Sequence, residues 1–319
     1  MDFPVRIFWS GRMKRFEWGI FGLSLCALFA CAHTGRTDAE PSYLATRACG
    51  ERHLLWKAEK DDLPEIWLLG SIHLADSSFY PLSEMVDSAL DRASLVAAEL
   101  DIRAESTVSQ TETLVRERGM LPENVRLRQV LPDSLYRQID SLARAWNFPV
   151  AVLENFRPWM VAFSLSALAF ERMGLSDEYG IDREILFRAE DRGKEIFALE
   201  TPQGQIGIFS DAGDSSGVSY LKNTLDEIRS ADSVISAIQK AWKCGDASAL
   251  RKILSAEPSG DALEEKLYTE RNVRMAKTLD SLSLAGKSVF AVVGSAHLVG
   301  AGENVLSLLE KKGYRIEAF

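Results

Sequence analysis

The chain has 319 residues, of which 46% are hydrophobic and 26% are charged, and its formal net charge at pH 7 is −9. This length is large for one domain but suits an α/β fold that carries an inserted helical part. The acidic balance argues against nucleic acid as a partner, because proteins that bind nucleic acid present basic surfaces to its phosphates.

Residues 1–30 are typical of a signal peptide. A basic region with Arg12, Lys14 and Arg15 precedes an apolar run that is shorter than the ~20 residues of a membrane span. The run ends Leu28-Phe29-Ala30-Cys31, which resembles the cleavage box of a bacterial lipoprotein. We therefore expect a lipoprotein signal peptide, and the alternative is a plain secretory signal.

Acylation of Cys31 would hold the protein at a membrane surface without a membrane-spanning segment. Ala32 follows the cysteine, and in Gram-negative lipoproteins the lack of Asp at this position usually implies sorting to the outer membrane. We expect an extracytoplasmic lipoprotein that faces the periplasm. Residues 31–50 would form a flexible tether, and 51–319 one α/β domain.

Two cysteines, Cys49 and Cys244, follow the predicted lipidation site. In an oxidising compartment they could form a disulfide, and the alternative is two separate thiols. The chain has no Cys-x-x-Cys sequence, which argues against a zinc-thiolate site or a thioredoxin-type site.

The predicted elements at the start of the domain are short strands and one helix. Strands are expected at 53–57 and 65–69 with a turn between them, followed by a helix at 81–92 and a buried strand at 94–100. Residues 103–285 are expected to be largely helical, and the apolar run 161–170 is too short for a membrane span and predicts a buried core helix. Further elements are expected at 182–191 (helix), 195–199 (strand), 202–210, 215–243, 246–253 and 263–282 (helices).

The chain ends with a predicted strand at 289–293, a helix at 303–312 and a strand at 314–318. Strands therefore occupy both ends of the domain and helices its middle. We expect an α/β fold with a mixed central sheet built from two similar halves, plus a helical insertion or cap.

The two halves share a motif that contains two of the four histidines. One copy reads Trp67-Leu68-Leu69-Gly70-Ser71-Ile72-His73-Leu74, and the other reads Ala291-Val292-Val293-Gly294-Ser295-Ala296-His297-Leu298. Gly-Ser at this spacing should precede fewer than about one histidine in a hundred by chance. Each histidine falls just past the carboxyl end of a predicted strand, where open α/β sheets place their ligands. We expect strand–Gly-Ser-x-His–helix units whose histidines face one site.

A divalent metal ion is the predicted ligand of this site. Neutral imidazole is the commonest protein ligand for a transition metal, and His73 and His297 could hold one Mn, Co, Zn or Fe ion from two strand ends. The alternative is that each histidine only caps its strand or bonds to backbone.

Glu99 ends the apolar strand 94–100, which we expect to run beside the first histidine strand. A carboxylate at the end of a buried strand is costly unless it is paired or metal-bound. Glu99 could be a third metal ligand or the base that activates water. The alternatives are that Asp101 points inward instead, or that Glu99 pairs with an arginine.

The repeated Gly-x-x-His motif followed by a glutamate resembles the TraB/GumN family and the related Tiki-type metalloproteases. The similarity covers roughly Trp56 to Phe319. It also includes these segments: Pro158-Trp159, Gly180-Ile181-Asp182-Arg183-Glu184-Ile185-Leu186, Gly193-Lys194-Glu195-Ile196, Leu199-Glu200-Thr201, Gln205, Arg271-Asn272 and Met275-Ala276. The resemblance implies that His73, His297 and Glu99 are functional.

Arg271, Asn272 and Glu200 are predicted to bind substrate. The Arg271 guanidinium could clamp a substrate carboxylate or stabilise an oxyanion, and otherwise it is a charge on a helix surface. Glu200 ends a strand as Glu99 does, but its place before Thr201-Pro202 also suits a helix entry. Asp182 could cap its helix as readily as bind anything.

We therefore expect a membrane-tethered, metal-dependent hydrolase, a peptidase for extracytoplasmic peptides, with His73, His297 and Glu99 as catalytic residues. The peptidase class comes from the Tiki resemblance. The alternative is a non-catalytic protein that sequesters a peptide, iron or haem, since TraB-like relatives are linked to shutting down peptide pheromone signals and a related fold binds haem iron. The chain lacks a Gly-x-Ser-x-Gly elbow and a phosphate loop.

Overall fold

The computed structural model describes residue 49, residues 53–254, residue 263 and residues 265–319. The predicted signal peptide at 1–30, Cys31 and nearly all of the predicted tether at 31–50 lie outside the described residues. Cys49 and Cys244 are joined in a disulfide, which decides between the two alternatives for this pair.

A six-stranded mixed sheet organises the chain, as the sequence predicts. Its strand order is β4-β3-β5-β2-β1-β6. The neighbours β4, β3, β5 and β2 are parallel, whereas β1 is antiparallel to both β2 and β6. The strand bounds are β1 (Leu55–Glu59), β2 (Ile66–Ser71), β3 (Leu95–Ala98), β4 (Glu195–Ala198), β5 (Val289–Gly294) and β6 (Arg315–Ala318).

The second histidine strand lies inside the sheet, between the first histidine strand and the strand of Glu99. Every residue of β2, β3 and β5 is buried, which is the pattern of strands covered on both faces. Val289 at the start of β5 is level with Ile66 of β2 on one side and with Leu95 of β3 on the other. The prediction that the Glu99 strand runs beside the first histidine strand is therefore wrong, because β5 forms hydrogen bonds along both of its edges.

Seven helices of the described chain pack on the sheet and share its hydrophobic core. Three of them have side-chain N-caps, since Ser83 accepts a hydrogen bond from Val86 N, Asp246 accepts one from Ala249 N and Asn304 accepts one from Ser307 N. The helices are α2 (Glu84–Arg92), α7 (Ile181–Asp191), α10 (Ala231–Lys243), α11 (Ala247–Leu254), α13 (Glu270–Leu284), α14 (Ser295–Val299) and α15 (Val305–Lys311).

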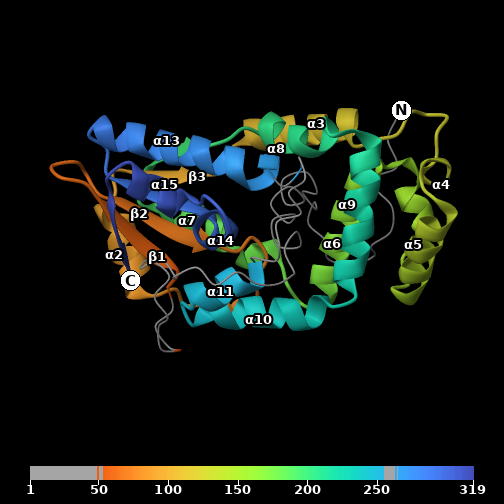
Figure 1. Ribbon diagram of the computed structural model, residues 1–319, viewed down its shortest axis with the longest axis horizontal. Coiled ribbons are helices and arrows are strands. Elements are labelled where there is room, and N and C mark those ends of the chain that lie inside the picture. The colour runs from red at the N-terminus through yellow and green to blue at the C-terminus, as the bar shows by residue number, and fades with distance from the viewer. Residues whose placement is uncertain (1–48, 50–52, 255–262, 264) are drawn as a thin grey trace.

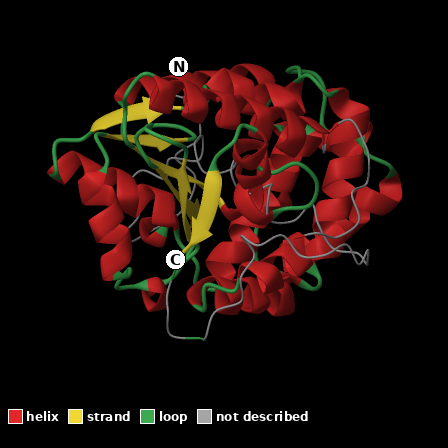
Figure 2. Cartoon of the chain, turned by 60° about the vertical axis from the view of Figure 1, so that its left-hand side comes forward, coloured by secondary structure: helices red, strands yellow, loops and turns green. Residues whose placement is uncertain are grey.

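The predicted helical cap is a separate group of helices with its own hydrophobic core. Figure 1 shows most of these helices at the end of the molecule away from the sheet, and Figure 2 shows the strands gathered toward one side of the molecule. It contains α3 (Glu105–Arg118), α4 (Leu127–Val130), α5 (Asp133–Ala145), α6 (Pro158–Arg172), α8 (Pro202–Ser210) and α9 (Gly213–Ile228). The apolar run 161–170 lies in α6, which is buried along most of its length. Within the described ranges, no helix has both the length and the apolar character that crossing a bilayer requires.

The two Gly-Ser-x-His units differ after their strands. Helix α14 begins at Ser295, directly after β5, and contains His297. His73 instead lies in a loop that leads through the 3-10 turn η2 (Ser77–Phe79), and α2 begins only at Glu84. The backbone after His73 is held by a bridge between Ala75 and Ser176, so it does not close into a helix there. The helix predicted after the first motif is therefore present as α2, but it does not follow its strand directly as α14 does.

Candidate functional site

Four neighbouring parallel strands deliver the candidate residues to one edge of the sheet. Glu200 follows β4, Glu99 follows β3, His297 follows β5 and His73 follows β2. The carboxyl ends of parallel strands lie at the same edge, which is where open α/β sheets bind their ligands. The structure thus brings the predicted residues together, although His73 and His297 are 224 positions apart in the chain. Beside them, a hydrogen bond from Ser295 Oγ to the carbonyl oxygen of Ser71 spans the same separation.

His297 is completely buried and is held by Asn272 of α13. Its Nδ1 lies 2.6 Å from Asn272 Oδ1, and Asn272 Nδ2 donates to the carbonyl oxygen of Glu303 at 2.8 Å. Because the amide nitrogen is the donor to Glu303, Oδ1 is the acceptor, and the proton of the imidazole belongs on Nδ1. Nε2 then carries a free lone pair, and this buried atom has no hydrogen-bond partner among the described residues.

Burial lowers the pKa of His297 to about 4, and the nearby positive charge of Arg271 acts in the same direction. The imidazole is therefore neutral at physiological pH, which is the form that binds metal ions.

His73 is held in a similar way by a carboxylate. Its Nδ1 lies 2.9 Å from Asp182 Oδ1, near the start of α7. Burial alone would lower the pKa of His73, but the negative charges of Asp182 and Glu99 outweigh it and raise the pKa above the ordinary value. Asp182 thus fixes the ring with Nδ1 turned to the carboxylate and Nε2 turned toward the site.

Gly180 allows this contact between α7 and the His73 loop. The Ile181 N–H donates to the carbonyl oxygen of Ile72 at 2.9 Å, so the two backbones run close together. A Cβ atom at position 180 would lie 2.6 Å from the carbonyl oxygen of His73. Only glycine fits such an approach, and this explains why Gly-Ile-Asp is the sequence that presents Asp182.

Glu99 lies between the two histidines and is 6% exposed. Its Oε1 accepts a hydrogen bond from Gly294 N at 2.7 Å and lies 3.9 Å from His297 Nε2. Its Oε2 accepts hydrogen bonds from Arg271 Nη2 at 2.7 Å and from Gln205 Nε2 at 3.2 Å. Burial alone would raise the pKa of Glu99, but the positive charge of Arg271 and the hydrogen bond from Gly294 N lower it to about 2. Glu99 is therefore a stable carboxylate.

Arg271 and Glu200 neutralise each other beside Glu99. Arg271 donates from Nε to Glu200 Oε1 at 2.9 Å, from Nη2 to Glu200 Oε2 at 2.6 Å, and from Nη1 to the carbonyl oxygen of Leu267 at 3.2 Å. Burial would lower the pKa of Arg271, but the two carboxylates raise it. All three guanidinium nitrogens are thus engaged within the protein. Substrate contact by Arg271, Asn272 and Glu200 stays a prediction, and their geometry is that of groups that position Glu99 and His297.

Gln205 and Asp182 have larger roles than the sequence indicated. Gln205, near the start of α8, donates from Nε2 to both Glu99 Oε2 and Glu200 Oε2. The sequence signal for Gln205 was its position just after the Leu199-Glu200-Thr201 segment. Thr201 caps α8, and Gln205 therefore lies near the start of that helix. Asp101, the alternative to Glu99, is turned away and accepts a hydrogen bond from Arg103.

The three predicted ligands surround one small space next to Gly294. A Cβ atom at this glycine would lie 3.2 Å from Glu99 Oε1, 3.6 Å from His73 Nε2 and 3.7 Å from His297 Cδ2. Among the described residues, no three or more His, Cys, Asp and Glu side chains are placed so that they could hold a metal ion as they stand. The donor chemistry nevertheless fits a divalent ion, because both histidines have Nδ1 engaged by an oxygen and Nε2 turned toward the common space.

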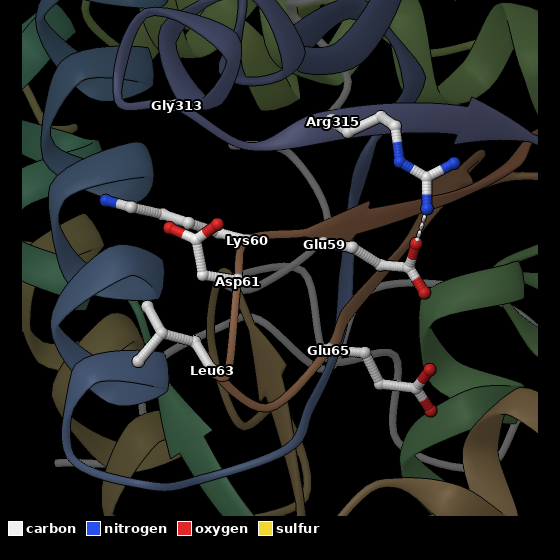
Figure 3. Close-up of a pocket in the computed structure, with 7 residues that line it drawn as sticks. All are labelled: Glu59, Lys60, Asp61, Leu63, Glu65, Gly313 and Arg315. Atoms are coloured by element: carbon white, nitrogen blue, oxygen red, sulfur yellow. Dashed lines mark hydrogen bonds and ion pairs between the residues drawn. The ribbon is translucent and has the colours of Figure 1, made fainter.

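A small pocket opens beside these residues, between the loop after β3 and the start of α7. It is lined by His73, Ala98, Glu99, Leu100, Ile102, Asp182 and Val292. A larger and more charged pocket lies at the turn between β1 and β2 (Figure 3), lined by Glu59, Lys60, Asp61, Leu63, Glu65, Gly313 and Arg315. That turn is at the opposite end of β2 from His73, and the pocket contains none of the predicted site residues.

Comparison with known proteins gives a consistent family. The TraB/PrgY/gumN family model matches residues 54–318. The uncharacterized protein YbaP of Escherichia coli (strain K12) is 23% identical over 253 residues, which cover 78% of this chain and 91% of YbaP.

Two longer relatives are named as metalloproteases. The metalloprotease TIKI homolog of Amphimedon queenslandica is 26% identical over 332 residues, covering 88% of this chain and 64% of that protein. Metalloprotease TIKI1 of Xenopus tropicalis is 21% identical over 314 residues, covering 82% and 60%. The chain thus spans less than two thirds of either TIKI protein. No solved structure matches the chain significantly.

Proposed function

Because this chain belongs to the TraB/PrgY/gumN family, whose matched region contains the whole candidate site, we propose that it is a metal-dependent peptidase. The observation that carries the proposal is the buried and unpartnered Nε2 of His297, which lies 3.9 Å from Glu99 Oε1. An imidazole nitrogen is rarely left without a partner in a protein interior, and a metal ion is a partner that a neutral imidazole suits. The distant similarity to the two TIKI metalloproteases supports the peptidase class.

In this proposal His73 and His297 hold the divalent ion through Nε2. Asp182 and Asn272 fix the two rings by their Nδ1 atoms, as the outer partners of metal-binding histidines commonly do. Glu99 supplies negative charge next to the ion, as a third ligand or as a neighbouring carboxylate. The formal charges support a cation here, since the site holds three carboxylates and one guanidinium: Glu99 and Glu200 pair with Arg271, and Asp182 contacts His73.

The residues around the ion have distinct tasks. A bound divalent ion polarises a carbonyl group and makes water a better nucleophile at neutral pH. Arg271 and the Gly294 N–H keep Glu99 ionised and in place. Both oxygens of Glu99 already accept hydrogen bonds, Oε1 from Gly294 N and Oε2 from Arg271 Nη2, and the charge of Arg271 lowers its pKa. We therefore favour a ligand or charge-balancing role over that of general base.

We also propose that the substrate is an extracytoplasmic peptide and that Cys31 carries a lipid anchor. The support for this location is the basic and apolar leader and the sequence Leu28-Phe29-Ala30-Cys31. The domain would then act at a membrane surface, joined to its anchor by residues 31–50.

The experiment is metal analysis of the purified protein, together with turnover of a peptide library with added Mn²⁺, Co²⁺ or Zn²⁺. We expect bound metal and turnover in the wild type, and loss of both in His73→Ala and His297→Ala. His53→Ala is the matched control, because His53 precedes β1 and is outside the site. Stoichiometric peptide binding without turnover would instead support a sequestering protein, and equal metal content in all variants would contradict the shared metal site.

A further inference from the structure

We propose that Ser295 and Trp242 are positioning residues for His73, because they hold the backbone that carries this histidine into the site. The inference rests on the proposed metal site and adds two residues on which its geometry depends. The three carbonyl groups before His73 each accept a hydrogen bond from a different helix: Gly70 O from Trp242 Nε1 of α10 at 2.8 Å, Ser71 O from Ser295 Oγ of α14 at 2.9 Å, and Ile72 O from Ile181 N of α7 at 2.9 Å.

Ser295 joins the two Gly-Ser-x-His motifs directly. Ser71 and Gly294 are the last residues paired between β2 and β5, and the buried Ser295 comes next, where α14 begins. Its hydrogen bond to the Ser71 carbonyl extends the contact between the two strands beyond their last paired residues. The strand end that leads to His73 is thereby tied to the start of the helix that contains His297.

Glycine at position 70 makes room for this contact. A Cβ atom there would lie 2.9 Å from Ser295 Oγ and 3.4 Å from Ser295 Cα. Gly70 of the first motif and Ser295 of the second therefore fit against each other. The serine of the first motif is different, since the buried hydroxyl group of Ser71 has no hydrogen-bond partner among the described residues. The two serines of the repeated motif thus have different roles, which offers a matched comparison.

Trp242 holds the same loop from α10 at both of its ends. Its indole N–H donates to Gly70 O, and its ring packs against Phe79 of η2 with ring centroids 5.2 Å apart. A buried tryptophan N–H usually has such a partner, and here the partner is the strand end that precedes the histidine. The end of α10 is itself fixed, because Cys244 follows Trp242 by two residues and forms the disulfide with Cys49.

A small displacement of His73 would matter because the two histidines reach the site from different strands. His73 Nε2 and His297 Cδ2 would lie 3.6 and 3.7 Å from the same Cβ position at Gly294. Metal–ligand distances in proteins vary by only about 0.2 Å, so the two rings must be placed accurately. Ser295 and Trp242 act on this placement through the backbone. Loss of either donor should weaken metal binding although all candidate ligands are still present.

The first test compares the two serines by hydrogen exchange and metal titration of the full-length protein. Ser295→Ala removes the donor to Ser71 O, whereas Ser71→Ala removes a hydroxyl group without a partner and keeps the carbonyl group. In the metal-free protein we expect faster amide exchange at residues 70–76 in Ser295→Ala than in Ser71→Ala or the wild type. Its affinity for Zn²⁺ or Co²⁺ should fall about 10-fold, the lower end of the effect of outer partners of metal-binding histidines.

Trp242→Phe gives an independent measurement, because it keeps an aromatic ring next to Phe79 but removes the N–H group. Trp159→Phe is the matched control, since Trp159 is buried in the helical cap and its Nε1 has no hydrogen-bond partner among the described residues. Both variants lose apolar contacts and stability. We expect faster exchange at residues 70–76, weaker metal binding and a changed Co²⁺ absorption spectrum in Trp242→Phe, and none of the three in Trp159→Phe.

The outcomes separate this inference from the proposed function. Metal binding by the wild type, with the same affinity in Ser295→Ala and Trp242→Phe, would overturn the positioning role and leave the metal site intact. Faster exchange with unchanged affinity would also overturn it, because the two residues would then stabilise the loop without placing a ligand. If the wild type binds no metal, the proposed function fails, and unchanged exchange at residues 70–76 in both variants would show separately that they do not hold the loop.

Discussion

Asn272 Oδ1 accepts a hydrogen bond from His297 Nδ1 at 2.6 Å while Asn272 Nδ2 donates to the carbonyl oxygen of Glu303, so one side chain links α13, α14 and the loop before α15. This relationship fixes which imidazole nitrogen is free. It also means that the orientation of a candidate metal ligand depends on a residue that is not itself one of the candidate ligands.

Asn272→Ala should therefore weaken metal binding without removing either histidine. Loss of an outer partner of a metal-binding histidine typically costs 10–100-fold in metal affinity. The substitution also leaves Glu303 O without its donor, which we expect to lower the free energy of unfolding by about 1–3 kcal/mol. Calorimetric titration with Zn²⁺ or Co²⁺ measures the affinity, and the Co²⁺ absorption spectrum reports the ligand geometry.

Asn272→Asp is the matched comparison, because it keeps an oxygen acceptor for His297 Nδ1. It should recover most of the metal affinity that Asn272→Ala loses. Equal affinity in the wild type and Asn272→Ala would show that this contact does not support a metal ligand.

Glu99→Gln should lower metal affinity, because the variant keeps the shape of the side chain but removes the negative charge next to both histidines. Glu154→Gln is a suitable control. Glu154 is also a buried carboxylate paired with an arginine, but it lies in the helical cap and pairs with Arg128. Unchanged metal content together with a ~10²–10⁴-fold loss of turnover would instead identify Glu99 as the general base. Unchanged affinity and turnover would mean that another carboxylate, such as Glu200, has the role.

The site was predictable from the sequence where it depends on local patterns. The two Gly-Ser-x-His motifs place His73 and His297 at strand ends, and the apolar run before Glu99 places that carboxylate at a third. Strand order was less accessible, since nothing near Leu95–Ala98 indicates that β5 and not β2 is its neighbour.

The partners of the site residues were the hardest to foresee. Arg271 meets Glu99 across 172 positions of the chain, and Gln205 meets it across 106. Such contacts depend on where the fold places α8 of the helical cap and α13 of the sheet layer, and their sequence signals are single polar residues on otherwise ordinary helices. The sequence alone therefore suggests that Arg271 clamps a substrate, whereas the fold shows that its three guanidinium nitrogens bind groups of the protein.

Acid should destabilise the metal-free protein through His297. In the folded state burial lowers the pKa of His297 to about 4 from an ordinary value of 6.5. As the pH falls through 6.5, the unfolded chain binds a proton that the folded protein does not, so the free energy of unfolding decreases until about pH 4. The full effect of such a shift is about 3 kcal/mol. We expect the Tm in chelator to fall over this range, and His297→Gln should remove that part of the fall. A slope that is identical in the variant would assign the acid sensitivity to other groups.

Cys31→Ser should abolish lipid attachment and leave an unprocessed precursor, because the thiol of this residue is the predicted site of acylation after the sequence Leu28-Phe29-Ala30. A single acyl chain binds a membrane only marginally, so stable anchoring requires the two or more chains of a mature lipoprotein. The mass of the amino-terminal peptide and the partition of the protein between membrane and soluble fractions measure the effect. Cys26→Ser is the matched control, since Cys26 lies within the apolar run and should not change processing. An unmodified mature terminus at His33 or beyond would mean ordinary secretion, and the domain would then meet its substrate free in solution.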